Sequence, residues 1–225
     1  MFDLEAVLLD LDGTLLNTAP DLTTALNKSL VNFGFAPVIV NEITPFISYG
    51  ALAMIEKSVP EATDTATKSK ILGWLLDYYE SHIADFTVPY EGMLQVIDSL
   101  EQHNTPWGIV TNKRERLAIP LMKTLNLSER AACLICGDTT AHSKPHPEPM
   151  LAACKQLAVS ANKCIYIGDA QHDITAGNHV NMKTLAATYG FLKPDDQPEN
   201  WGADALIDHP LAILDWITAN THAFK

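Results

Sequence analysis

Short runs of apolar residues, each followed by a polar turn, recur along the chain and predict buried strands. The runs cover residues 5–9, 106–112, 132–137, 163–169 and 183–190. Stretches with helical periodicity alternate with them, at residues 93–103, 114–125, 147–158 and 172–179. Strands that alternate with helices are typical of a parallel sheet covered on both faces. The pattern therefore predicts a Rossmann-like α/β core.

A different pattern fills the segment between the first and second predicted strands. Helical periodicity extends over residues 21–33, 44–59 and 65–86, and nothing between these stretches reads as a strand. A helical insertion after the first strand would form a separate lobe. We expect residues 18–87 to be a helical cap domain and residues 1–17 and 88–225 to form the α/β core.

Composition and charge narrow the function classes. Of the 225 residues, 47% are hydrophobic and 19% charged, as in soluble globular proteins. A formal net charge of −12 argues against non-specific binding to nucleic acid or to an anionic membrane surface. No segment approaches the roughly 18 apolar residues of a membrane span, and the N-terminus carries acids where a secretory signal carries basic residues. We expect a cytoplasmic protein, monomeric or homodimeric, without membrane or nucleic-acid partners.

Polar residues follow four of the predicted strands. In open parallel sheets, ligands bind in the crevice beyond the carboxyl ends of the strands. The residues at these ends are Asp10, Asp12 and Gly13 after the first strand, Thr111 and Asn112 after the second, Lys144 after the third, and Asp169 and Asp173 after the fourth. We therefore expect all four clusters to meet at one edge of the sheet.

These residue types match the needs of phosphate ester hydrolysis. A carboxylate such as Asp10 can take the phosphoryl group and divide one hard step into two easier ones. A second carboxyl group, Asp12, can protonate the departing alkoxide and later deprotonate the attacking water. Alone, such a pair of acids would be an ordinary turn after a strand. The interpretation depends on the other clusters being present.

The negative charge on the transferred oxygens requires a cation and hydrogen-bond donors. Mg²⁺ prefers one or two carboxylates together with phosphate and water, and Asp10 and Asp169 could supply the carboxylates. Donors for the phosphate are the Thr111 hydroxyl, the Lys144 ammonium, and backbone N–H groups near Gly13 and Asn112. The sequence thus predicts a magnesium-dependent phosphatase.

The segments DLDGTLLNT, VTNK, SKPHPEP and GDAQHD, in this order, are very similar to the four-motif signature of the haloacid dehalogenase-like hydrolase superfamily. Within it, the chain resembles the phosphoglycolate phosphatase branch, whose members carry a helical cap between the first and second motifs. The similarity runs from Leu4 to about Pro210. The resemblance implies a Rossmann-like core with an inserted helical cap.

The resemblance also implies roles for the first motif. Asp10 matches the nucleophile and a metal ligand of the family. Asp12 matches the general acid/base, and its main-chain carbonyl would also bind the metal. An aspartate at position 12 sets the chain apart from the dehalogenases and the ion-pumping ATPases of the superfamily, which lack one there.

The later motifs complete the implied site. Thr111 and Lys144 match the phosphate-binding pair of the family. Asp169 matches a further ligand of Mg²⁺, and Asp173 lies nearby as a direct or water-mediated partner of the metal.

The motifs leave the substrate open. Stretches such as GDTTAHSKPHPEPML resemble bacterial proteins called phosphoglycolate phosphatase, and part of that subgroup resembles N-acetylmuramic acid 6-phosphate phosphatase. The chain departs from the usual pattern at Asn17, where many members have an acid, and at Ser48-Tyr49-Gly50, where many caps have a glycine pair. A sugar-phosphate mutase of the same superfamily is an alternative enzyme. A scaffold protein with this fold is another alternative, but it would not need the acids.

Other residues receive structural interpretations. Cys133 and Cys136 form a C-x-x-C pair, but they lie in an apolar strand and would point to opposite faces of the sheet. Trp74, Tyr78 and Tyr79 recur with the spacing of a helix and predict packing inside the cap.

Four histidines lie close to the motifs: His142, His146, His172 and His179. None lies on a predicted helix with the spacing and carboxylate of a zinc site, and the inferred cation prefers oxygen. We predict loop or surface positions for them, with His172 at the rim of the site. For Lys113 and Arg114, an exposed helix start and a contact with a second anionic group of the substrate are both open.

Overall fold

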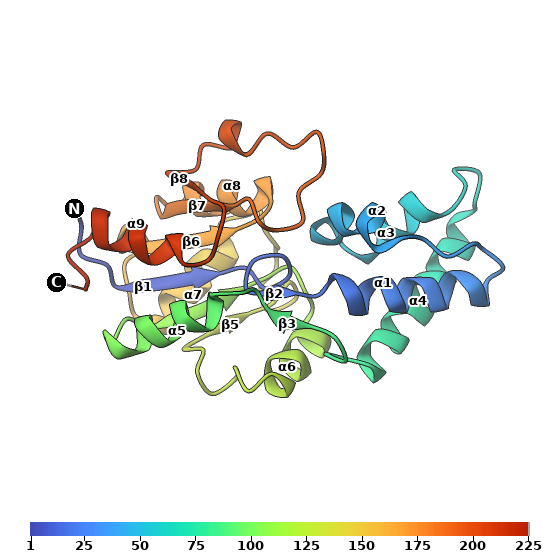
Figure 1. The fold of residues 1–225 in the computed structure, drawn as a ribbon, viewed down its shortest axis with the longest axis horizontal. Coiled ribbons are helices and arrows are strands. Elements are labelled where there is room, and N and C mark those ends of the chain that lie inside the picture. The colour runs from blue at the N-terminus through green and yellow to red at the C-terminus, as the bar shows by residue number, and fades with distance from the viewer. Residues whose placement is uncertain (225) are drawn as a thin grey trace.

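The computed structural model describes residues 1–224, and within them one sheet organises the core (Figure 1). Its strands are β1 Ala6–Leu9, β4 Trp107–Val110, β5 Leu134–Ile135, β6 Cys164–Gly168, β7 Lys183–Ala187 and β8 Ala205–Ile207. They pair in parallel in the order β5-β4-β1-β6-β7-β8. The predicted Rossmann-like core is confirmed. The sequence pattern missed β8, an edge strand too short to stand out as an apolar run.

Helices cover both faces of this sheet. Their bounds are α5 Met93–Gln102, α6 Glu115–Thr124, α7 Glu148–Leu157, α8 Gln171–His179 and α9 Ala212–Asn220, with short 3₁₀ turns η2 Ala161–Lys163 and η3 Pro198–Asn200. Val7 and Leu9 of β1 share a hydrophobic cluster with α5, α6 and α9, whereas Ala6 and Leu8 pack with α7 and α8. Burial on both faces explains why the strands are continuous apolar runs.

The cap lies beside the core as a separate helical lobe (Figure 1). It consists of α1 Ala19–Asn32, α2 Val40–Ile43, the 3₁₀ helix η1 Thr44–Tyr49, α3 Ala51–Ser58 and α4 Thr65–Ser81. A second hydrophobic cluster, made almost wholly of cap residues, holds these helices together. The inserted helical cap is confirmed.

Two of the predicted cap helices differ in extent. The stretch 44–59 is divided because Gly50 adopts a φ of +90°, which separates η1 from α3. In the stretch 65–86, the helix ends at Ser81. There the buried Asp21 carboxylate accepts hydrogen bonds from the backbone N–H groups of Phe86 and Thr87, and it thereby directs the chain back towards the core.

The two connections between core and cap run side by side. Strand β2, Leu16–Asn17, pairs antiparallel with β3, Val88–Pro89. Because this ribbon contains both crossings, we propose residues 18 and 87 as the limits of the cap.

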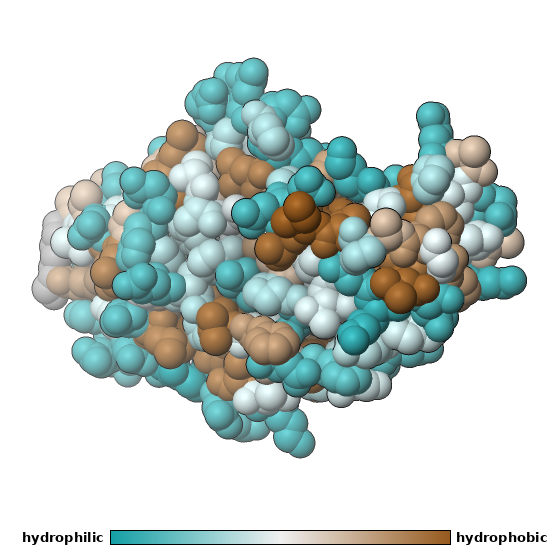
Figure 2. Space-filling view, turned by 45° about the vertical axis from the view of Figure 1, so that its right-hand side comes forward, coloured by the Kyte–Doolittle hydropathy of each residue, from teal (hydrophilic) through white to brown (hydrophobic). Residues whose placement is uncertain are grey.

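The surface mixes hydrophilic side chains with separate hydrophobic patches, of which a marked one lies where the cap approaches the core in this view (Figure 2). In the cap, Ile39, Val40 and Leu52 are among the exposed large apolar residues. No helix within residues 1–224 combines the length and apolar character needed to cross a bilayer.

Candidate active site

The predicted motif residues gather at the carboxyl edge of the sheet. Asp10 directly follows β1, and Thr111 and Asp169 follow the two neighbouring strands, β4 and β6. These three residues are at most 5% exposed. The parallel topology therefore brings together side chains that are far apart in the sequence.

Lys144 is the centre of a buried ion-pair network. Its Nζ lies 2.9 Å from Asp10 Oδ1 and 2.7 Å from Asp173 Oδ1. It also donates hydrogen bonds to the main-chain oxygen of Val110 at 2.9 Å and to the Tyr166 hydroxyl at 2.8 Å. The contact with Asp10 is an ion pair without hydrogen-bond alignment, and Asp10 Oδ1 has no hydrogen-bond partner. Lys144 thus presents a fixed positive charge beside Asp10.

Burial and neighbouring charges shift the pKa values of the acids around Lys144, two upwards and one downwards. Burial raises the pKa of Asp10 more than the Lys144 charge lowers it. Burial and the charges of Asp10 and Asp173 raise the pKa of Asp169 to about 8. Burial also opposes ionisation of Asp173, but the Lys144 charge outweighs it and lowers the pKa of that carboxyl. Three buried carboxylates around one ammonium leave an excess of negative charge that a further cation would neutralise.

The same three acids fit a hard divalent cation. One oxygen from each of Asp10, Asp169 and Asp173 lies within 4.8 Å of the others. Carboxylate oxygens are the donors that Mg²⁺ prefers, and Asp10 Oδ1, which accepts no hydrogen bond although it lies beside Lys144 Nζ, could bind the ion. The carboxylate of Asp12 lies outside this group.

Asp12 lies in a separate environment with its own cation. Lys113 Nζ contacts its two carboxylate oxygens at 3.0 and 3.2 Å, and the Thr18 hydroxyl donates to Oδ1 at 2.6 Å. The Lys113 side chain is only 6% exposed, so an exposed helix start is wrong for this residue. Burial alone would lower the pKa of Lys113, but the Asp12 charge raises it overall. Pairing with Asp12 explains why this lysine is buried.

Gly13 allows the first motif to approach the fourth. Its φ is +86°, and a Cβ at this position would collide with the Asp169 carboxylate. The next residue, Thr14, donates from its hydroxyl to Asp169 Oδ1 at 3.1 Å. A glycine at this turn is therefore needed to bring the first loop against Asp169.

Thr111 and Asn112 occupy different places at the site. Thr111 is 3% exposed, and its hydroxyl oxygen accepts a hydrogen bond from the backbone N–H of Lys113. The exposed Asn112 side chain bridges the main chain of Lys144, with its Nδ2 3.1 Å from the carbonyl and its Oδ1 3.0 Å from the N–H. Asn112 thus holds the loop that carries Lys144, a contact that the sequence pattern did not reveal.

The cap adds neutral side chains that sequence reasoning did not place in the site. The Ser48 hydroxyl of η1 donates to Asp169 Oδ2 at 2.9 Å. Trp74 and Tyr78 stack within the cap as predicted, with ring centroids 5.3 Å apart. Tyr79 is buried in the cap cluster, also as predicted, and its ring in addition lies beneath Lys113 Nζ, 4.6 Å from the ring centroid. Its buried hydroxyl has no hydrogen-bond partner. Docking of the cap, which local spacing does not encode, creates these contacts.

The cysteines and histidines near the motifs lie where the sequence pattern predicts them. Cys133 and Cys136 are buried and belong to the clusters on opposite faces of the sheet, as predicted. The exposed surface positions of His142, His146 and His179 are confirmed. His172 is partly buried at the rim, with Nε2 3.8 Å from Asp173 Oδ1.

Comparison with known proteins identifies the family. The family model described as "Haloacid dehalogenase-like hydrolase" matches residues 7–187. N-acetylmuramic acid 6-phosphate phosphatase of Pseudomonas aeruginosa is 38% identical over 212 residues, which cover 94% of each chain. Phosphoglycolate phosphatase of Xylella fastidiosa is 39% identical over 204 residues, 91% of this chain and 89% of the relative.

Solved structures agree on the fold. The crystal structure of a predicted phosphoglycolate phosphatase from Haemophilus somnus superimposes with a TM-score of 0.86, covering 96% of this chain and 98% of the other at 22% identity. The chain therefore belongs to the haloacid dehalogenase-like hydrolases, and it is a phosphoric monoester hydrolase.

Proposed function

We propose that the protein is a Mg²⁺-dependent phosphatase that hydrolyses a small phosphate monoester through an aspartyl phosphate on Asp10. The supporting observation is the separation of two neighbouring acids into different environments. Asp10 lies with Lys144 and two further acids, whereas Asp12 lies with Lys113 and is 15% exposed. Paired carboxyl groups with different surroundings are typical of an acid/base pair with divided roles.

In the first step, an Asp10 oxygen attacks the phosphorus, and the bond from phosphorus to the ester oxygen breaks. Asp12 gives its proton to the departing alkoxide. In the second step, the Asp12 carboxylate takes a proton from water, whose oxygen attacks the phosphorus of the aspartyl phosphate. Inorganic phosphate leaves, and Asp10 and protonated Asp12 are regenerated.

Charge neutralisation accompanies both steps. The Lys144 ammonium and the Thr111 hydroxyl bind the phosphoryl oxygens, together with backbone N–H groups near Gly13 and Asn112. The residues that would hold Mg²⁺ are Asp10, Asp169, Asp173 and the main-chain oxygen of Asp12. The ion would supply positive charge to the transferred phosphoryl group.

The cap excludes water and contributes to the choice of substrate. Ser48 brings a hydroxyl group from the cap to Asp169 of the core, and Tyr79 places its ring beneath Lys113. Closure over a small substrate would remove competing water from the aspartyl phosphate site during transfer.

Phosphoglycolate is the first substrate that we propose, and N-acetylmuramic acid 6-phosphate is the second. The second candidate rests on two Pseudomonas relatives with that activity in their names, at 38% and 40% identity. Both compounds carry a carboxylate besides the phosphate ester. Lys193, whose Nζ lies 3.4 Å from the Tyr49 ring centroid at the junction of cap and core, offers a cation for such a group.

We also propose that the protein acts in the cytoplasm as a monomer or homodimer on a phosphorylated metabolite. The net charge of −12 supports a partner other than nucleic acid.

The test is release of inorganic phosphate with Mg²⁺, measured for both compounds in parallel. Higher kcat/KM for phosphoglycolate supports the first substrate, and higher kcat/KM for the amino sugar supports the second. Transfer of the phosphoryl group to a second position on a sugar, without phosphate release, would identify a mutase. No turnover of either compound or of p-nitrophenyl phosphate would contradict phosphatase activity.

A further inference from the structure

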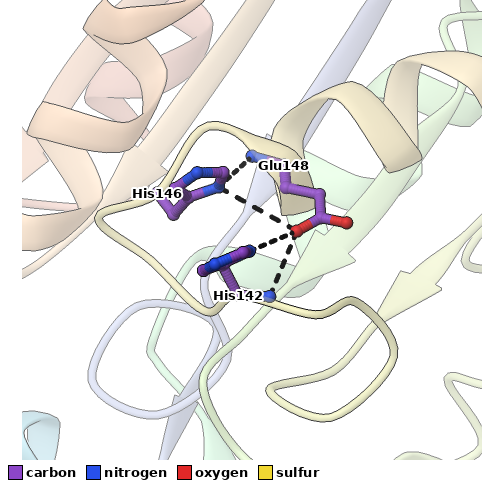
Figure 3. Close-up of side chains that lie close together, drawn as sticks. All are labelled: His142, His146 and Glu148. Atoms are coloured by element: carbon purple, nitrogen blue, oxygen red, sulfur yellow. Dashed lines mark hydrogen bonds and ion pairs between the residues drawn. The ribbon is translucent and has the colours of Figure 1, made fainter.

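A second group of potential metal ligands lies outside the active site. Among the described residues, His142, His146 and Glu148 place one donor atom each within 4.8 Å of the others. His142 Nδ1 lies 3.0 Å from Glu148 Oε2, and His146 Nδ1 lies 4.0 Å from the same oxygen. Figure 3 shows both imidazole rings directed towards one Glu148 oxygen.

These separations suit a tetrahedral transition-metal site. With metal–ligand distances of about 2.0–2.1 Å, two ligands of a tetrahedral ion lie about 3.3 Å apart. The observed separations of 3.0 and 4.0 Å lie on either side of that value. His142 and His146 lie on a surface loop, and Glu148 begins α7 directly after it.

Each donor atom now takes part in a hydrogen bond that a metal ion would replace. His146 Nδ1 accepts a hydrogen bond from the Glu148 backbone N–H at 3.2 Å, so this nitrogen is unprotonated, and a metal would take over the lone pair that the N–H now occupies. The Glu148 carboxylate can only accept, so His142 Nδ1 donates to it, and a metal would bind this nitrogen once the ring proton is on Nε2.

The surroundings provide space for an ion and its remaining ligands. His142 and His146 line an open hollow of about 570 Å³, and His179 of α8 lies on its wall. The rings of His142 and His146 stack with centroids 4.2 Å apart, so they are already gathered on one side. The loop that lines this hollow also carries Lys144, whose ammonium group faces Asp10 in the active site.

We propose that His142, His146 and Glu148 form a surface site for a divalent transition ion of the Zn²⁺ type, distinct from the Mg²⁺ site. Two imidazoles and one carboxylate favour Zn²⁺ and its neighbours in the first transition row, whereas the acids beside Lys144 favour Mg²⁺. The two sites therefore select ions of different chemistry.

The experiment measures Zn²⁺ affinity by calorimetry on the untagged full-length protein in saturating Mg²⁺. His142→Ala removes one imidazole, and Glu148→Gln retains the shape of the carboxylate side chain without its charge. We expect each to weaken Zn²⁺ binding by at least about tenfold, since loss of even an outer partner of a metal site costs that much. His103→Ala is the matched control, because His103 is also exposed but lies outside the cluster.

A second readout is the NMR shift of the imidazole nitrogens on addition of Zn²⁺. Selective shifts of His142 and His146, with His103 unchanged, are expected. Equal Zn²⁺ affinity of the wild type and both site variants would overturn the proposal. So would shifts at other histidines alone.

Discussion

The core and the cap bring different kinds of side chain to the same site. The core contributes charges: the acids that follow β1 and β6, and two buried lysines that pair with them. The cap contributes neutral hydroxyl groups, with Ser48 bonded to Asp169 and Tyr79 placed beneath Lys113. Charged groups that stabilise a reacting phosphate are thus on the rigid sheet, and adaptable polar groups are on the inserted lobe.

The contacts that attach the cap to the core differ in strength from those inside the core. Arg116 of α6 pairs with Asp77 and Glu80 of α4, but the side chains are 45 to 78% exposed. Exposed ion pairs contribute about 0–1 kcal/mol each. Tyr49 reaches Asp196 with a hydrogen bond of 3.5 Å, which is long. These polar contacts therefore contribute little to holding the cap against the core, whereas the ion pairs of Lys144 are buried.

The largest effect is expected from a substitution of the nucleophile in the core. Asp10→Asn keeps the size of the side chain but removes the attacking carboxylate, and we expect turnover of every substrate to fall by about 10⁴-fold or more. Folding should survive, because Lys144 keeps its partner Asp173. Circular dichroism and phosphate release are measured together. Asp215→Asn, an exposed acid on α9, is the control and should retain full activity.

Near-wild-type activity of Asp10→Asn would break the comparison, because the chemistry would then not depend on this carboxylate of the core.

Metal binding should stabilise the core more strongly as the pH rises. The pKa of Asp169 is raised from 3.8 to about 8, so the protonated carboxyl stabilises the folded state. Its contribution to the free energy of unfolding is complete below about pH 4 and is lost as the pH rises through about 8. Asp173 has a lowered pKa, and its contribution is lost only as the pH falls below its ordinary range. Mg²⁺ favours ionised carboxylates and should therefore raise the Tm more at pH 8 than at pH 5.5.

At a Mg²⁺ concentration of about 100 times Kd, the gain is about 2.7 kcal/mol, or roughly 5–10 °C in Tm for a chain of this size. Thermal unfolding with Mg²⁺ and with chelator gives the difference at each pH. Asp169→Asn should remove most of the pH dependence of the gain in Tm that Mg²⁺ produces. A larger gain at pH 5.5 than at pH 8 would contradict the assignment of Asp169 to the metal site.

The cap should give the smallest effect and a selective one. Ser48→Ala removes one hydrogen bond to a carboxylate, which corresponds to about 1.5 kcal/mol or roughly tenfold. We expect kcat/KM for the preferred substrate to fall by about that factor, with a smaller change for p-nitrophenyl phosphate, which does not need selection by the cap. Ser58→Ala is the matched control, since its hydroxyl bonds only to Met54 within α3.

If Ser48→Ala abolished hydrolysis of all esters alike, the division between a catalytic core and a selective cap would fail.

The same division explains what could be predicted from the sequence. Asp10, Thr111 and Asp169 follow apolar strands, and the parallel topology alone places such strand ends together. Ser48 and Tyr79 reach the site only because the cap docks in a particular orientation, and that orientation depends on packing between distant segments. Lys113 was ambiguous for a related reason, since its burial depends on Asp12 and on Tyr79 of the cap.

The surface histidines show a further limit of local patterns. His142, His146 and Glu148 lie in a loop, where spacing along the chain does not fix which side chains meet. Spacing along a helix cannot reveal a cluster of this kind, because the course of the loop brings its side chains together.

The most direct test of the central claim is to trap the phosphoryl group during turnover. The enzyme is quenched in acid within milliseconds of adding substrate and Mg²⁺, and then reduced with borohydride, which converts an aspartyl phosphate to homoserine. Peptide mass spectrometry should find homoserine at position 10, and none in Asp10→Asn. Homoserine at another aspartate, or rapid phosphate release with no reduced aspartate at any time point, would contradict nucleophilic catalysis by Asp10.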